Sequence, residues 1–281
     1  MVAVATTAEP IAARGEMPRL WRGVVLALAG LYFLVPLGAA FWFTAYNRVT
    51  GFSLAPYAEL WSAEGFWSSL LLSLGLAAAT IALVLLLMLP AMITVRLAAP
   101  RLRPVLEIIC TLPLVIPPIA FVAGYSRSVA LAQDLVAPTP FWATLTAMRS
   151  TTFPAVLVFA YVILVLPFVY RSLDAGLRTM DLRTMVEAAR NLGASWPHVM
   201  FRVIIPNLRS ALASAAFLSL ALVLGEYTMA SIMGYRPFAV WIVSISGSKG
   251  QLSVAVSVLS LLLTWLLLLL VSRGTNRGRQ A

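Results

Sequence analysis

Residues able to bind a partner or a solute are concentrated in two stretches of this chain. The first, EAARNLGASWPHVMFRVIIP, runs from Glu187 to Pro206 and combines charged, small and helix-ending residues. The second, LGEYTMAS, places Glu226 inside an apolar run. A carboxylate at the centre of a membrane helix costs about 2.5–3.5 kcal/mol on insertion scales, so Glu226 is a functional candidate by default. The alternatives for Glu226 are a side chain that reaches the outer surface and an ion pair with an arginine of a neighbour.

The other reactive residue types give no pattern for catalysis or metal binding. Cys110 is the only cysteine, which excludes an intramolecular disulfide. His198 is the only histidine, and we expect it to be a surface or docking residue rather than a metal ligand. Lys249 is the only lysine, and it lacks the upstream glycine of a phosphate-binding G-x-x-x-x-G-K-[ST] loop. We therefore expect no catalytic residue, no metal site and no cofactor in this chain.

The composition is that of an integral membrane protein. Hydrophobic residues make up 61% of the 281 positions and charged residues only 11%, whereas soluble domains carry roughly 25% charged residues. A run of roughly 20 apolar residues can cross the hydrocarbon core as a helix. Six such runs predict an all-α membrane protein, and they lie at residues 21–45, 67–94, 105–126, 153–173, 208–233 and 252–272.

The basic residues predict orientation rather than nucleic-acid binding. The formal net charge is +10, but the arginines lie in short loops between the apolar runs and not on one surface. Sorting the 20 Lys and Arg residues by alternate loops places 15 on one side and 5 on the other. This bias predicts that both termini are cytoplasmic, with an N-terminal tail at 1–20 and a C-terminal tail at 273–281.

The longest predicted cytoplasmic loop, residues 174–206, has the pattern of two short amphipathic helices. Gly193 suits the left-handed position that ends a helix, and Ser195 suits the N-cap of the next, with Pro197 in its first turn. Apolar residues at helical spacing are Leu182, Met185, Val186, Ala189 and Leu192 in the first helix, and Val199, Met200, Val203 and Ile204 in the second. Such a pair needs a surface to dock against.

The third apolar run contains a proline cluster, LPLVIPPIAFVAGY. Pro113, Pro117 and Pro118 each remove a backbone donor, so they kink or break the helix. Freed carbonyls are tolerated at membrane depth only against protein or a water-lined cavity. We expect this span to face a bundle interior or a pathway, with an ordinary packed kink as the alternative. The candidate pathway residues are Pro117, Pro118, Glu226, Tyr227, Thr228 and Ser231.

The loop at 174–206 resembles the EAA loop of bacterial ABC importer permeases. That pattern is Glu-Ala-Ala, three residues, Gly, nine residues, an aliphatic residue, any residue, Leu and Pro. The chain has it as Glu187, Ala188, Ala189, Gly193, Val203, Ile205 and Pro206, with Val and Ile where Ile and Leu are usual. The third and fourth runs are similar to those of the polyamine, sulfate and ferric-ion branch, and the similarity covers roughly residues 65–272. We call residues 174–206 the EAA segment.

The resemblance implies a fold, a location and a set of partners. The fold is the six-helix type I ABC importer permease (MetI-like) fold, spanning residues 21–272 in the bacterial inner membrane among lipid. Implied partners are two ABC ATPase subunits that carry ATP and Mg²⁺, a second permease that is a paralogue or a second copy, and an extracytoplasmic substrate-binding protein. This chain would form half of the pathway and would not be an enzyme. The implied ATPase-coupling residues are Glu187, Ala188, Ala189, Gly193, Trp196 and Pro206.

The substrate class stays open at this stage. A carboxylate at Glu226 favours a cationic solute such as the polyamines spermidine and putrescine, and the resemblance also allows ferric ion, thiamine, phosphonate, sulfate or a sugar. The alternative class is a self-contained secondary transporter, which usually has internal repeats with broken helices in both halves, and we find no repeat in the sequence. A membrane-embedded enzyme is a more distant alternative, because the predicted spans lack a cluster of His or Asp residues.

Overall fold

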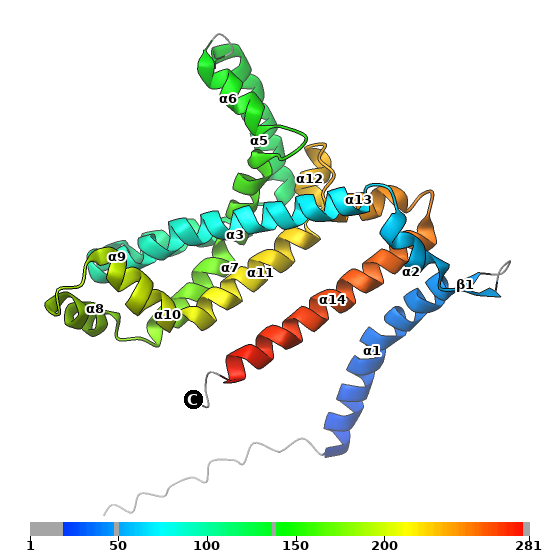
Figure 1. The fold of residues 1–281 in the computed structure, drawn as a ribbon, viewed down its shortest axis with the longest axis horizontal. Coiled ribbons are helices and arrows are strands. Elements are labelled where there is room, and N and C mark those ends of the chain that lie inside the picture. Colours follow the sequence, from blue (N-terminus) through cyan, green and yellow to red (C-terminus); the bar gives the residue numbers. More distant parts are fainter. Residues whose placement is uncertain (1–18, 48–50, 137–138, 278–281) are drawn as a thin grey trace, which may run out of the picture. The chain divides into compact units, whose positions relative to one another are not determined.

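The computed structural model describes residues 19–47, 51–136 and 139–277, and most of these residues are helical (Figure 1). Residues 1–18 of the predicted N-terminal tail and 278–281 of the predicted C-terminal tail lie outside the described residues. The last helix continues through Arg277. The chain divides into two units, Met1–Ser53 and Leu54–Ala281, and each is described by itself.

The first unit consists of one long helix and a short hairpin. Helix α1 (Arg19–Ala45) is followed by strands β1 (Tyr46–Asn47) and β2 (Gly51–Phe52), which pair antiparallel. The most apolar stretch of α1 has none of its side chains buried inside the protein. An apolar helix with no covered face suits a lipid environment, which agrees with the first predicted span.

The second unit is built around three long helices. Helices α3 (Phe66–Leu97), α7 (Ala155–Arg178) and α11 (Arg209–Gly225) pack against one another and run side by side in Figure 1. The other helical elements are α2 (Ala55–Glu59), η1 (Leu60–Ser62), η2 (Pro100–Leu102), α4 (Arg103–Thr111), η3 (Leu112–Leu114), α5 (Pro118–Val136), α6 (Pro140–Met148), α8 (Leu182–Asn191), α9 (Trp196–His198), η4 (Val199–Ile204), α10 (Ile205–Asn207), α12 (Thr228–Ile232), α13 (Phe238–Ile245) and α14 (Gly250–Arg277).

Helix α7 is the centre of the core. Side chains on it that are fully buried include Leu157, Tyr161, Val165 and Leu173, and they meet Leu76 and neighbouring residues of α3. In the membrane, water supplies no driving force between helices, so close packing and polar contacts must hold them together. Polar contacts at the end of the core next to the EAA segment therefore add to the close packing of the helices there.

The span count differs from the prediction of six. Among the described residues, three helices are long and apolar enough to cross a membrane, namely α1, α3 and α7. Two bent helix pairs raise the number to five if each pair is one span. The most apolar part of α14, Gly250–Leu266, is a shorter apolar helix. Six full crossings are thus not confirmed, whereas a helical membrane protein is.

The proline cluster breaks the third predicted span, as the sequence indicated. The piece before the break, Pro100–Leu114, and the piece after it, Pro118–Ala132, are bent by 97°. Pro117 and Pro118 lie at the break and are exposed. A proline cannot donate its backbone nitrogen and its ring clashes with the preceding turn, which explains why α5 starts afresh at Pro118.

The prediction of one continuous helix over 208–233 was wrong. Helix α11 ends at Gly225, and Glu226 takes an extended conformation with φ −75° and ψ 120° before α12 begins at Thr228. The physical reason is local, because the Glu226 carboxylate accepts hydrogen bonds from the first free backbone N–H groups of the next helix. The sequence showed the acid but not that it would begin a new helix.

Candidate functional site

Residues 174–178 of the EAA segment complete α7, and the rest of the segment folds as two helical pieces joined by a sharp turn. The first piece is α8, and the second runs without a break from Trp196 to Asn207 through α9, η4 and α10. Both lie beyond the ends of α7 and α11 (Figure 1). The predicted pair of helices is confirmed, although its second member contains a wide π-helical turn at Val199–Ile204.

The turn between the two pieces depends on Gly193. Its φ is +83°, the left-handed region that favours glycine. The Gly193 N–H donates to the Arg190 carbonyl at 2.9 Å, and the Ala194 N–H donates to the Ala189 carbonyl at 3.0 Å. These two bonds are the Schellman arrangement that ends an α-helix. The left-handed glycine is confirmed, and Ser195 occupies the predicted N-cap position without a side-chain capping bond.

One face of the segment anchors it to the rest of the chain. Leu182 and Val186 of α8 are buried, and Val199 and Ile204 of the second piece are completely buried in the main core. For Val199 and Ile204, the surface against which the second apolar stripe docks is therefore the chain's own core. Helical spacing identified the apolar face correctly but could not tell a partner from the chain's own core.

The opposite face of the segment carries exposed polar and apolar side chains. Leu192 is 89% exposed, and Trp196 and Phe201 are also exposed. Glu187 is exposed and accepts a hydrogen bond from Arg183 Nε at 3.1 Å. Of the other predicted coupling residues, Ala188 and Pro206 lie on the surface and Ala189 is half-buried.

Arg190 stabilises the turn from its exposed side. The Arg190 guanidinium donates to the Ala194 carbonyl at 2.9 Å, and its carbon lies 5.8 Å from the ring centroid of Trp196. A cation over an indole face is attractive by roughly 0.5–1 kcal/mol at an exposed site. Arg190 thus holds the end of α8 against the start of the second piece.

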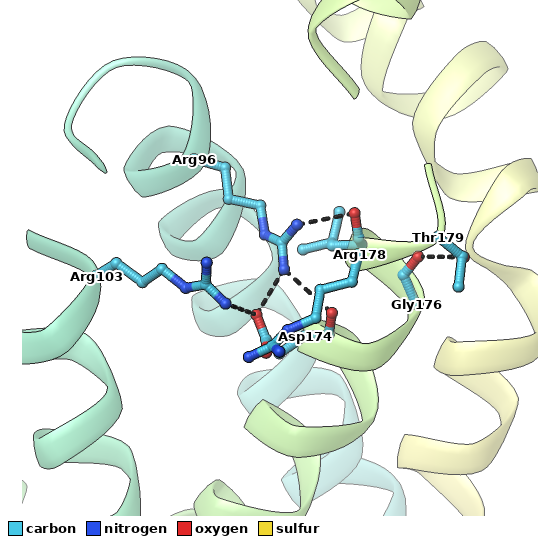
Figure 2. Close-up of polar contacts among 7 residues, drawn as sticks. Arg96, Arg103, Asp174, Gly176, Arg178 and Thr179 are labelled. Atoms are coloured by element: carbon cyan, nitrogen blue, oxygen red, sulfur yellow. Dashed lines mark hydrogen bonds and ion pairs between the residues drawn. The ribbon is translucent and has the colours of Figure 1, made fainter. Parts of the chain in front are cut away.

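A cluster of charged side chains lies at the start of the EAA segment, where α7 ends. We call Arg96, Arg103, Asp174 and Arg178 the Asp174 cluster (Figure 2). Figure 2 shows guanidinium groups from three helices turned toward one carboxylate. Arg96 and Arg103 approach Oδ1 of Asp174 at 2.5 and 3.5 Å, and Arg178 Nε donates to Oδ2 at 2.7 Å. The Asp174 side chain is only 10% exposed, so these contacts are shielded from water.

Arg96 also binds the end of the α7 backbone. Its guanidinium donates to the carbonyl of Leu177 at 2.8 Å and to the carbonyl of Asp174 at 3.1 Å. The last carbonyls of a helix lack partners within the helix and carry partial negative charge, so an arginine there is favourable. From the sequence, these arginines indicated only the orientation of the chain. The sequence feature that could have indicated this cluster was Asp174, an acidic residue four positions before Arg178 in a chain with few acidic residues.

The predicted pathway residues on α11 and α12 gather at the helix break. The Glu226 carboxylate accepts from the backbone N–H of Met229 at 2.6 Å and of Ala230 at 3.2 Å, and Glu226 is 9% exposed. The hydroxyl of Tyr161 is buried close to this carboxylate without a hydrogen bond of normal geometry. Tyr227 is exposed, whereas Thr228 and Ser231 are half-buried. Helix α12 packs against α5, the helix that starts at Pro118.

A cavity of about 220 Å³ lies between α5, α6, α7 and the end of α12. Its wall is mainly aromatic and aliphatic, and Arg149 is its one charged lining residue. None of the predicted pathway residues lines it; the lining residues include Phe121, Tyr125, Trp142, Phe159 and Met233. This cavity was not predictable from the sequence, because its walls come from segments that only the fold brings together.

Metal-binding geometry is not found in the part of the chain that the structure describes. No group of three or more His, Cys, Asp or Glu side chains there is close enough to hold a metal ion.

The helices define the class, a helical membrane protein, and the EAA segment forms a pair of helical pieces between α7 and α11. The sequence model of the family described as binding-protein-dependent transport system inner membrane component matches residues 100–276, more than half of the chain. The chain belongs to this family. It is thus the permease component of an ABC transport system, which also includes an ATPase and a binding protein. The comparison with curated proteins gives no match.

Proposed function

We propose that this chain moves a small solute into the cell by coupling its membrane helices to ATP hydrolysis on partner subunits. The EAA segment is the docking site for an ABC ATPase, and its face with Glu187, Leu192, Trp196 and Phe201 is the contact surface. The segment lies on the cytoplasmic side with both termini, in agreement with the bias of basic residues toward these loops.

The observation that carries this proposal is the exposure of large apolar side chains on a segment that is otherwise firmly anchored. Leu192 is 89% exposed at the tip of the turn, and Trp196 and Phe201 of the second piece are exposed as well. An apolar patch rimmed by charged side chains marks a protein contact site. The rim here is Glu187, with Arg183 and Arg190 beside it.

The proposal is tested by co-purification of the ATPase from the same transport system with tagged variants of this chain. Leu192→Glu places a charge in the centre of the patch, and Glu187→Arg reverses its rim charge. We expect both variants to reach the membrane at normal levels and to retain much less ATPase. The matched control is Leu102→Glu, because Leu102 is an exposed leucine in the other short loop at this end of the core. Normal ATPase retention by both test variants would exclude the docking role.

The pathway is formed with a second permease subunit, since one such chain supplies half of it. A paralogue or a second copy of this chain fits the proposal. The exposed apolar residues next to the proline break, Val115 and Ile119 among them, are available for that contact or for lipid. ATP and Mg²⁺ bind to the ATPase partners and not to this chain.

Two solute classes have a specific observation in their favour. A cationic solute such as a polyamine is favoured by Glu226, a buried carboxylate at a helix break. An anionic solute such as a phosphonate or sulfate is favoured by Arg149, an exposed residue at the edge of the otherwise apolar cavity, which adds a positive charge next to it. The polyamine class is our first choice, because Glu226 is buried whereas Arg149 is exposed.

A further inference from the structure

The Asp174 cluster joins the ends of three helices at the base of the EAA segment. Arg96 lies in the last turn of α3, Arg103 is the first residue of α4, and Asp174 and Arg178 lie in the last turns of α7 (Figure 2). Asp174 is the single carboxylate that all three guanidinium groups share. The Asp174 side chain is therefore one direct polar link from the end of α7 to both α3 and α4, beside the bonds of Arg96 to the α7 backbone.

The contacts within the cluster differ in strength. Arg96 makes three hydrogen bonds to α7 and has a mostly buried side chain, so α3 and α7 are held firmly. Arg103 approaches Asp174 at 3.5 Å and its side chain is 43% exposed. It forms the one ion pair between α4 and the rest of the chain among the described residues. Helix α4 is thus tied at its first residue by the weaker of the contacts.

The two helical pieces of the EAA segment are connected to the end of α7 on both sides. Only three residues, Thr179 to Asp181, separate Arg178 from the start of α8. At its other end, the carbonyl of Ala211 in α11 accepts a hydrogen bond from Ser172 Oγ of α7 at 2.9 Å. A segment fixed at both ends moves its attachment points when it is displaced, instead of swinging on loose linkers.

Helix α4 leads directly to the proline break. Nine residues after Arg103 the chain enters η3, and the 97° bend to α5 follows. The break is a hinge candidate, because prolines leave backbone carbonyls without helical partners. The cluster therefore lies between the segment that contacts the ATPase and the point where the third span changes direction.

We infer that Asp174 is a positioning residue for transport, by which the ends of α3, α4 and α7 move as one body with the EAA segment and pass its displacement to the proline break. This inference rests on the proposed coupling function of the EAA segment. A role in stability alone would predict that loss of Asp174 loosens the core evenly, whereas a positioning role predicts that α4 stops following the EAA segment.

The experiment is hydrogen exchange on the intact complex of permease, ATPase and binding protein in lipid nanodiscs, with and without ATP and vanadate. In the wild type we expect nucleotide to change exchange in α8 and also in residues 103–120. In Asp174→Asn we expect the change in α8 to remain and the change in 103–120 to disappear. Asp174→Glu keeps the carboxylate charge and is expected to restore the nucleotide-dependent change in residues 103–120.

A second variant and a control keep the result interpretable. Arg103→Gln removes only the exposed contact to α4 and leaves Arg96 on Asp174, so the core stays intact while 103–120 stops responding. Glu59→Gln breaks the ion pair with Lys249, which joins α2 to the residue before α14, and should alter neither response. A response of 103–120 that persists in Asp174→Asn or in Arg103→Gln overturns the inference. No response of α8 in the wild type would instead refute the proposed function.

Discussion

Gly176 of α7 and Ala211 of α11 touch so closely that no side chain fits between them. A Cβ atom on Gly176 would lie 2.5 Å from Cβ of Ala211 and 3.1 Å from Cδ2 of Leu208. Heavy atoms at 2.5 Å overlap, so one of the two helices would have to shift. The glycine permits a close approach of α7 and α11 at the two ends of the EAA segment.

The first prediction is that Gly176→Ala destabilises the protein and Gly124→Ala does not. Overpacking a tight contact costs about 1–3 kcal/mol in the free energy of unfolding. Gly124 in α5 is a matched helical control, because no atom lies within 4 Å of the place that a Cβ atom would occupy there. Thermal unfolding of the purified chain in detergent measures both. Equal midpoints for the two variants would contradict the close contact.

A compensating change sharpens this test. The double variant Gly176→Ala with Ala211→Gly moves the methyl group from α11 to α7, which leaves the nearest atoms at 3.1 Å on the flexible Leu208 side chain and at 3.9 Å on the Ala211 backbone. We expect the double variant to recover most of the lost stability. Additive losses from the two changes would show that the helices do not meet at this point.

Features that depend on neighbouring residues were predictable from the sequence. The helix end at Gly193, the paired helices of the EAA segment and the break at Pro118 each follow from a residue type and its immediate context. Features that depend on distant residues were not predictable. Arg96 and Asp174 are 78 positions apart, and only the packing of α3 on α7 brings them together.

Burial was the other feature that spacing could not settle. Val199 and Leu192 are both apolar residues at helical spacing in the EAA segment, yet Val199 is completely buried and Leu192 is 89% exposed. The difference depends on which side of each helical piece faces the core, and the left-handed turn at Gly193 sets the direction in which the second piece leaves the first.

The second prediction concerns the turn of the EAA segment. No atom lies within 4 Å of the position that a Cβ on Gly193 would occupy, so Gly193→Ala introduces backbone strain and no clash. A non-glycine residue in the left-handed region costs roughly 1–2 kcal/mol, and Asn tolerates it better than Ala. Proline also removes the N–H that binds the Arg190 carbonyl. Retention of the ATPase partner should therefore fall in the order Gly, Asn, Ala, Pro.

An unchanged level of ATPase in the proline variant would contradict a role for this turn. The control for expression is the amount of each variant in the membrane fraction, which we expect to be equal because the strained residue is exposed and outside the core.

The third prediction is a pH dependence at the start of α8. Asp181 is the N-cap of α8, and its side chain accepts from the Thr184 N–H at 3.3 Å. Hydrogen bonds from Thr184 hold the pKa of the Asp181 carboxyl below its ordinary value. Its stabilising effect is therefore complete above the ordinary aspartate pKa of about 3.9 and is lost as the pH falls through the lowered value of the folded state.

Amide exchange at Thr184, corrected for the intrinsic rate at each pH, measures this effect. Protection in the wild type should be constant above about pH 4 and should decline as the pH falls below the ordinary aspartate pKa of about 3.9. Asp181→Asn keeps an acceptor without a titrating group, so its protection should be nearly independent of pH. Asp181→Ala should lose protection already at neutral pH. A wild type that is as flat as the Asn variant would show that the carboxylate does not cap α8.

The fourth prediction separates the two solute classes by a pair of charge-removing variants. Glu226→Gln keeps one carbonyl oxygen that can accept from Met229, the shorter of the two bonds, so the start of α12 should largely survive, while the negative charge and the second acceptor oxygen, which binds Ala230, are lost. Arg149→Gln removes the positive charge at the edge of the cavity and keeps the Arg149 backbone carbonyl that accepts from the Tyr235 hydroxyl at 3.2 Å. Neither change is expected to alter assembly with the ATPase.

The measurement is ATPase activity of the reconstituted complex, titrated with spermidine, putrescine, thiamine, ferric citrate, a phosphonate, sulfate and maltose in the presence of the binding protein. If the solute is a polyamine, Glu226→Gln should raise the concentration for half-maximal stimulation and Arg149→Gln should not. If the solute is an anion, the two variants should exchange these effects. Glu226→Ala, which lacks the acceptor as well, should also lower the unfolding temperature, because two backbone donors lose their partner in a buried place. An identical response of Glu226→Gln and the wild type to every stimulating solute would leave Glu226 with its capping role alone.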